Sequence, residues 1–93
     1  MAEQPIARRC VIRGRVQGVS FRAWMRDAAE ARGLGGWVRN REDGAVEAVI
    51  EGDPARLRAM LNALESGPPA ARVDDVETSE ETPSAPAGFE IRA

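Results

Sequence analysis

Residues 14–22 read GRVQGVSFR, and this stretch holds the residue types best suited to binding an anion. Gly14 and Gly18 bracket a loop whose backbone N–H groups can turn inward, because glycine leaves room for a ligand beside the chain. Arg22 follows at the start of a helical pattern and can bind the same anion with its two-pronged guanidinium. Together with a helix N-terminus, these groups would form a phosphate site. The same glycines can instead serve only to turn the chain, and the loop chemistry alone leaves both interpretations open.

The loop lies between an expected strand and an expected helix. Residues 7–13 (ARRCVIR) alternate with period two, which places Cys10 and Ile12 on one face of a strand. After the loop the period becomes that of a helix, which Ser20 can cap and Gly33 can end. The apolar stripe of this helix consists of Phe21, Trp24, Met25 and Ala28.

A hairpin is predicted next. Asp43-Gly44 separates two β-prone runs, and glycine accepts the positive φ that a tight turn needs. Alternation puts Val38 and Asn40 on one face of the first run. On the second run the faces are Val46, Ala48 and Ile50 on one side, and Glu47 and Glu51 on the other. We expect these acids, like the remaining acids of the chain, to be solvated.

A second helix follows the hairpin. Asp53-Pro54 supplies an acidic cap and a proline at the first helical position, and Gly67 is the expected stop. Its apolar stripe consists of Leu57, Met60, Leu61 and Leu64.

The last third of the chain predicts two strands. Residues 71–78 are β-prone, but Val73 and Val76 interrupt the alternation, as they would at a bulge or an exposed edge. Residues 82–88 (TPSAPAG) predict a loop, and residues 89–92 (FEIR) a short closing strand.

The order β-α-β-β-α-β predicts an α+β protein with the ferredoxin-like sandwich fold. We expect an antiparallel four-stranded sheet, with the short terminal strand in addition, and both helices on one face. The length of 93 residues predicts one domain over residues 1–93. This fold hosts many functions and so carries no functional claim by itself.

Charge is unevenly distributed along the chain. Residues 1–41 hold nine arginines and three acids, net +6, whereas residues 42–93 hold four arginines and twelve acids, net −8. The overall charge of −2 argues against a general nucleic-acid binder. One cysteine, no run of about 20 apolar residues and no apolar leader favour a cytoplasmic protein away from membranes.

Two motifs resemble the acylphosphatase family. GRVQGVSFR resembles its glycine-valine-glutamine-glycine-valine loop closed by Phe-Arg, and GWVRN followed by DGAVEAVIEG resembles its second motif. The resemblance extends from about Arg8 to Arg92. It implies the βαββαβ sandwich and hydrolysis of the carboxyl–phosphate anhydride of acylphosphates. It also implies a monomer that needs no metal or cofactor and yields inorganic phosphate, which would act as an inhibitor.

The resemblance also implies roles for particular residues. The loop that would cradle the phosphate consists of Arg15, Val16, Gln17, Gly18 and Val19. Arg22 would bind the phosphate oxygens, and Asn40 would hold the attacking water for in-line displacement. A carboxylate leaves easily, because its conjugate acid has a pKa near 4, so a chain without histidine can perform this chemistry. The alternatives are a non-catalytic anion-binding module of the same fold and an RNA-binding module, which would need exposed aromatics on the sheet.

Several other residues carry expectations. Trp24 and Met25 should pack in the core, and Cys10 should be a core residue rather than a nucleophile. Trp37 would either cover the open face of the sheet or line a site for the acyl group. Gln17 would either contact the substrate or hold the shape of the loop, and we favour the second role. Arg15 would steer anions or simply be solvated. Related chains often end in an aromatic residue, so the packing of the Arg92-Ala93 end stays open.

Overall fold

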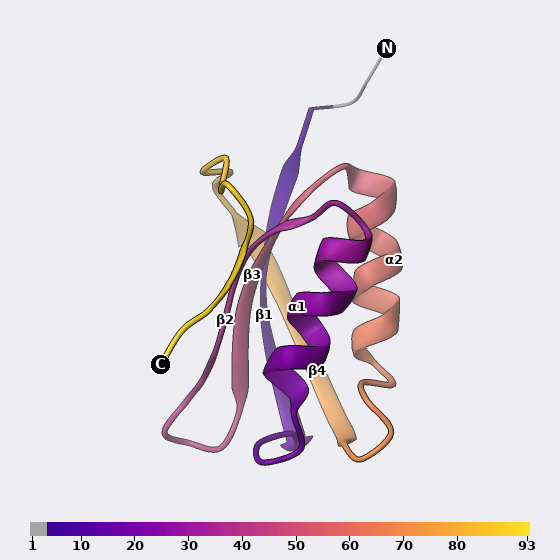
Figure 1. Ribbon diagram of the computed structural model, residues 1–93, viewed down its shortest axis with the longest axis vertical. Helices are drawn as coiled ribbons and strands as arrows, with labels where there is room; N and C mark the ends of the chain where they lie inside the picture. Colours follow the sequence, from indigo (N-terminus) through magenta and orange to yellow (C-terminus); the bar gives the residue numbers. More distant parts are fainter. Residues whose placement is uncertain (1–3) are drawn as a thin grey trace.

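The computed structural model describes residues 4–93, in which five strands and two helices follow one another along the chain (Figure 1). In chain order the elements are β1 (Ile6–Arg15), α1 (Phe21–Ala31), β2 (Gly35–Asn40), β3 (Val46–Gly52), α2 (Pro54–Leu64), β4 (Arg72–Glu81) and β5 (Phe89–Ile91). This order confirms the predicted β-α-β-β-α-β pattern with its short terminal strand. The single domain expected over residues 1–93 stays a prediction, and its first three residues lie outside the described range.

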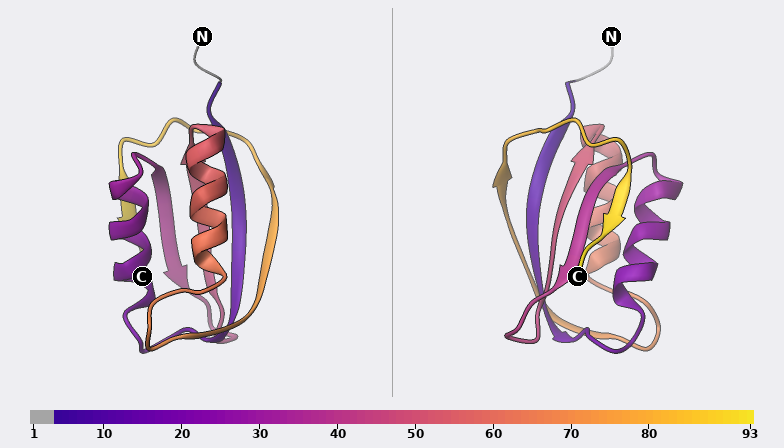
Figure 2. Two further views of the ribbon diagram at one scale, coloured as in Figure 1. Left: turned by 90° about the vertical axis from the view of Figure 1, so that its right-hand side faces the viewer. Right: turned by 60° about the vertical axis from the view of Figure 1, so that its left-hand side comes forward.

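The strands form one sheet in the order β4-β1-β3-β2-β5. The first four are antiparallel to their neighbours, as expected, whereas β5 pairs in parallel with β2 and makes the sheet mixed. Both helices cover the same face of the sheet (Figure 2), with α1 packed on β2 and β5 and α2 packed on β3. Within residues 4–93, no helix lies on the opposite face.

The core lies between the helices and the sheet. Its largest fully buried side chains include Phe21 and Met25 from α1, Leu57 from α2, and Ile12 and Ile50 from the sheet. Trp24 is half-buried, packs against this core and meets the Phe21 ring edge-on at 5.4 Å between centroids. The predicted core positions of the two helices are therefore confirmed.

The helix ends follow the sequence signals with one exception. Asp53 caps α2 by accepting a hydrogen bond from the Arg56 N–H at 3.1 Å, and Gly33 adopts a left-handed φ of 68° just after α1. The expectation that Ser20 caps α1 is wrong. Ser20 has a left-handed φ of 61° and its side chain makes no capping hydrogen bond, because capping requires the residue to be extended.

Strand β4 is both bulged and at the edge of the sheet, as the interrupted alternation predicted. Its register against β1 shifts between Arg13, which pairs with Asp75, and Gly14, which pairs with Val73. Gly14 has a φ of 133°, and a Cβ there would meet the Arg72 carbonyl oxygen. The bulge therefore requires glycine at the point where β1 leads into the loop.

The expectation that the acids on the open face of the sheet are solvated is wrong for Glu47 and Glu51. Glu47 is completely buried and forms ion pairs with Arg9 on β1 and Arg39 on β2. Glu51 is also buried, and its carboxylate accepts hydrogen bonds from the N–H groups of Ser84 and Ala85 at 2.8 and 2.9 Å. Each carboxylate finds its partners on a neighbouring segment, which alternation within β3 does not reveal.

Candidate active site

A cleft with a volume of about 370 Å³ opens where the β1–α1 loop, the end of β2 and strand β5 meet. It is lined by Val16, Gly18, Ser20, Phe21, Arg22, Ala23, Asn40 and Ile91. The loop and the β2–β3 turn lie together at the lower end of the molecule in Figure 1. Residues that are far apart in the sequence thus contribute to one hollow.

The loop of residues 16–20 presents free backbone donors. Val16 is buried in the core and anchors the loop, while Gly18 has a φ of 73° with open space where a Cβ would be. Within residues 4–93, the N–H groups of residues 17–20 donate to no other residue. Successive unpaired N–H groups in a loop with left-handed residues form a concavity suited to an anion.

The N-terminus of α1 adds further unpaired N–H groups, and so further positive potential, to those of the loop. No side chain caps the helix, and its first turn contains no acid. The first N–H groups of a helix lack intrahelical partners and carry the positive end of the helix dipole. They therefore remain available to a ligand in the cleft.

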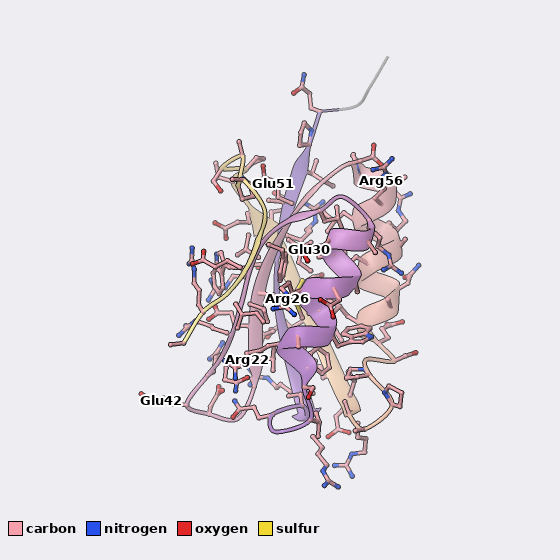
Figure 3. The ribbon with its side chains drawn as sticks, viewed as in Figure 1. Arg22, Arg26, Glu30, Glu42, Glu51 and Arg56 are labelled. Atoms are coloured by element: carbon pink, nitrogen blue, oxygen red, sulfur yellow. The ribbon has the colours of Figure 1, made fainter. Side chains whose placement is uncertain are left out.

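Arg22 lies in this first turn and lines the cleft. Figure 3 shows it at the N-terminal end of α1, on the side of β2 and the C-terminal segment. One guanidinium nitrogen donates to the Arg92 carbonyl oxygen at 3.4 Å. The guanidinium has five donors, so the others are free for an anion.

Asn40 is the last residue of β2 and lines the same cleft. It pairs with Val46 and shares the helix-covered face with the fully buried Val38. Its side chain is therefore on the face that also carries the loop and α1. The amide group supplies both an acceptor and donors, which suits it to hold a water molecule.

Gln17 connects the loop to the β2–β3 turn. Its Nε2 donates to the carbonyl oxygens of Arg41 and Ala45 at 2.8 and 2.9 Å. The side chain therefore holds the loop in place, as expected.

The remaining loop residues point elsewhere. The side chains of Arg15, Gln17 and Val19 do not line the cleft: Arg15 is exposed and Val19 packs against the core. Sequence reasoning missed the cleft wall formed by Ala23 and Ile91. Neither residue type carries a chemical signal, and only the fold brings them beside the loop.

Two other residues are placed outside the cleft. Trp37 lies on the open face of the sheet, where the Arg92 guanidinium carbon is 4.8 Å from its ring centroid. Cys10 is completely buried, and burial raises the pKa of its thiol to about 12. The burial confirms the expected core position of Cys10, and the raised pKa disfavours the thiolate form.

Residues 4–93 contain no group of three or more His, Cys, Asp or Glu side chains placed to hold a metal ion. No helix in the same range is long and apolar enough to cross a membrane.

Known proteins are similar to this chain in both sequence and structure. The acylphosphatase family model matches residues 8–91. An acylphosphatase of Azorhizobium caulinodans is 52% identical over 84 residues, covering 89% of this chain and 90% of that protein. The solved acylphosphatase structures of Bacillus subtilis and Coxiella burnetii both give a TM-score of 0.91, at 36% and 34% identity. Each covers 95% of this chain, which in turn covers 99% and 93% of theirs.

The chain belongs to the acylphosphatase family. The family resemblance of its two motifs is confirmed, and so is the ferredoxin-like α+β fold.

Proposed function

We propose that the chain is a metal-independent acylphosphatase that uses the cleft between the β1–α1 loop and the end of β2. Acylphosphate hydrolysis is supported by about 50% identity to acylphosphatases over most of the chain. One observation carries the assignment of the site: Arg22 and Asn40, which lie on different elements, line the same cleft as the loop with free N–H groups.

The phosphate binds in the loop of residues 15–19. The backbone N–H groups and the N-terminus of α1 surround its oxygens, and Arg22 neutralises their charge with a two-pronged contact. Phosphoryl transfer depends mainly on positioning and charge stabilisation, and these groups supply both. The positive charge comes from the protein itself, so the mechanism needs no metal ion.

Asn40 holds the attacking water. The water oxygen forms a bond to phosphorus on the side opposite the acyl oxygen, and the bond from phosphorus to that acyl oxygen breaks. The carboxylate leaves with the electron pair and requires no proton, because its conjugate acid has a pKa near 4 and the anion is stable at neutral pH. The proton of the water passes to a phosphate oxygen or to solvent, since an amide is not a base at neutral pH.

The proposal also includes product inhibition, the oligomeric state and the location of the protein. Inorganic phosphate, as product, occupies the loop and inhibits competitively, and the protein acts as a cytoplasmic monomer on small acylphosphates. We propose no role for RNA, because the aromatic residues do not form an exposed platform on the sheet. Phe21 and Phe89 are buried, Trp24 packs on the core, and Trp37 is covered by Arg92.

Hydrolysis of benzoyl phosphate in the presence of excess chelator tests the proposal. Turnover under these conditions supports a metal-independent acylphosphatase. If phosphate raises the melting temperature but no substrate is hydrolysed, the chain is the non-catalytic anion-binding alternative. Turnover that requires added metal would contradict the mechanism.

A further inference from the structure

The two halves of the cleft come from separate parts of the chain. The phosphate loop and Arg22 belong to the β1–α1 junction, whereas Asn40 is the last residue of β2. In the sequence, most of α1 separates the two. A water molecule on Asn40 reaches the phosphorus in line only if these halves keep a fixed separation. A misplacement of about 1 Å can cost about 10²-fold in rate.

Gln17 bridges the two halves directly. Its carboxamide donates to the carbonyl oxygens of Arg41 and Ala45, at 2.8 and 2.9 Å. Arg41 immediately follows Asn40, and Ala45 immediately precedes Val46, the residue that pairs with Asn40 across the hairpin. One side chain of the loop is thus bonded to both ends of the β2–β3 turn, beside the residue that holds the water.

Both N–H donors of the Gln17 side chain are used in hydrogen bonds to the turn. Its nitrogen has two protons, and both are directed to carbonyl oxygens of the turn. The Ala45 carbonyl oxygen also accepts a hydrogen bond from the Arg41 N–H at 2.8 Å. This oxygen therefore takes part both in the hairpin and in the bond to the Gln17 side chain. The side-chain nitrogen is therefore committed to the turn and not to the phosphate.

We propose that Gln17 is a positioning residue that fixes Asn40 relative to the phosphate loop. It acts on the attacking water and leaves the affinity for the anion nearly unchanged. This inference rests on the proposed function of the cleft.

A double-mutant cycle with Asn40 tests the inference. Gln17→Met keeps the length of the side chain and removes both donors. It should lower kcat by about 10- to 100-fold, while the inhibition constant of inorganic phosphate stays within about twofold. In the Asn40→Ala background the same substitution should cause no further loss of kcat. An equal loss in both backgrounds, or a phosphate affinity that falls as much as kcat, would overturn the inference.

Asp43→Asn is the matched control in the same turn. The Asp43 carboxylate accepts from the Ala45 N–H at 3.1 Å and does not contact Gln17. Its substitution should loosen the turn but keep kcat within about twofold. A loss of kcat as large as that of Gln17→Met would mean that any loosening of the turn has this effect, which would also overturn the inference.

A separate readout distinguishes the failure of this inference from the failure of the proposed function. In the wild type, binding of inorganic phosphate should shift the amide NMR signals of Gly44 and Ala45, and in Gln17→Met it should not. Absence of this shift in a wild type that binds phosphate would overturn the inference alone. Absence of both turnover and phosphate binding would overturn the proposed function and the inference with it.

Discussion

Arg39 donates from its Nε to the Glu47 carboxylate at 2.7 Å, on the face of the sheet opposite the helices. Arg9 from β1 pairs with the second oxygen of the same carboxylate. Glu47 itself is completely buried, so this three-residue network covers the middle of the face opposite α1 and α2. It joins β1, β3 and β2, the central strands of the sheet.

Loss of the Glu47 charge should therefore destabilise the fold. We expect Glu47→Gln to lower the free energy of unfolding by about 1–3 kcal/mol. The effect should be smaller than for a fully buried pair, because the Arg9 and Arg39 side chains are 41% and 43% exposed and can be rehydrated. Urea denaturation measures the change. Glu77→Gln is the control: its side chain is 66% exposed, and a loss as large as that of Glu47→Gln would contradict the prediction.

Substitution of Arg22 should affect both binding and catalysis. Arg22→Ala should lower kcat/KM by about 10²–10³-fold, as for the loss of an oxyanion donor, and should weaken inhibition by phosphate. Arg22→Lys should recover only part of the activity, because lysine lacks the two-pronged geometry. Steady-state kinetics with benzoyl phosphate measure both effects. Arg26→Ala, one turn further along α1 and outside the cleft, should keep the wild-type rate.

Substitution of Asn40 should separate the two effects. Asn40→Ala should lower kcat by about 10²-fold, because the water loses its position, while the inhibition constant of phosphate changes little. Asn40→Asp has the same shape but adds a negative charge beside the phosphate. It should therefore weaken phosphate inhibition as well, and equal inhibition of the two variants would argue against a site beside the anion.

Two glycines with positive φ should respond differently to substitution. At Gly36, with a φ of 133°, a Cβ would meet the Val49 carbonyl oxygen, so Gly36→Ala should destabilise the fold by about 3 kcal/mol or more. At Gly44, with a φ of 93°, a Cβ would meet nothing within 4 Å, and only backbone strain of about 1–2 kcal/mol is expected. Thermal denaturation measures both, and the reverse order would contradict the structure of the β2–β3 hairpin.

Cys10 should make stability depend on pH in the alkaline range. Its pKa is raised by burial from 9.0 to about 12, so the unfolded chain loses this proton before the folded chain does. The stability that the neutral thiol contributes is present below pH 9 and is lost as the pH rises toward 12. Chemical denaturation across this range should show the decline, and Cys10→Ala should reduce it. An unchanged decline in that variant would assign it to other groups.

Local signals in the sequence predicted most of the framework. Period changes located the strands and helices, and Asp53 and Gly33 have the roles that their residue types indicate. The partners of Glu47 and Glu51 could not be predicted, because alternation assigns a residue to a face but does not say what covers that face. The cover depends on which strands are neighbours and in which register, and these are properties of the assembled sheet.

The candidate site shows the same division. The placement of the β1–α1 loop and of Arg22 beside one another could be predicted, because these residues follow one another closely in the sequence. The wall at Ile91 could not be predicted, because its position depends on the parallel pairing of β5 with β2. The left-handed conformation of Ser20 also follows from the shape of the loop and not from the residue type.

Because β5 forms part of the cleft wall, the proposed site is complete only after β5 has paired with β2. Ile91 lines the cleft and the Arg92 carbonyl oxygen accepts a hydrogen bond from Arg22, yet Arg92 lies 70 positions after Arg22 in the sequence. The β1–α1 loop is synthesised long before β5, so the cleft wall is added later than the residues proposed for the chemistry. An intermediate with only the four antiparallel strands would contain every residue proposed for the chemistry and still lack a finished site.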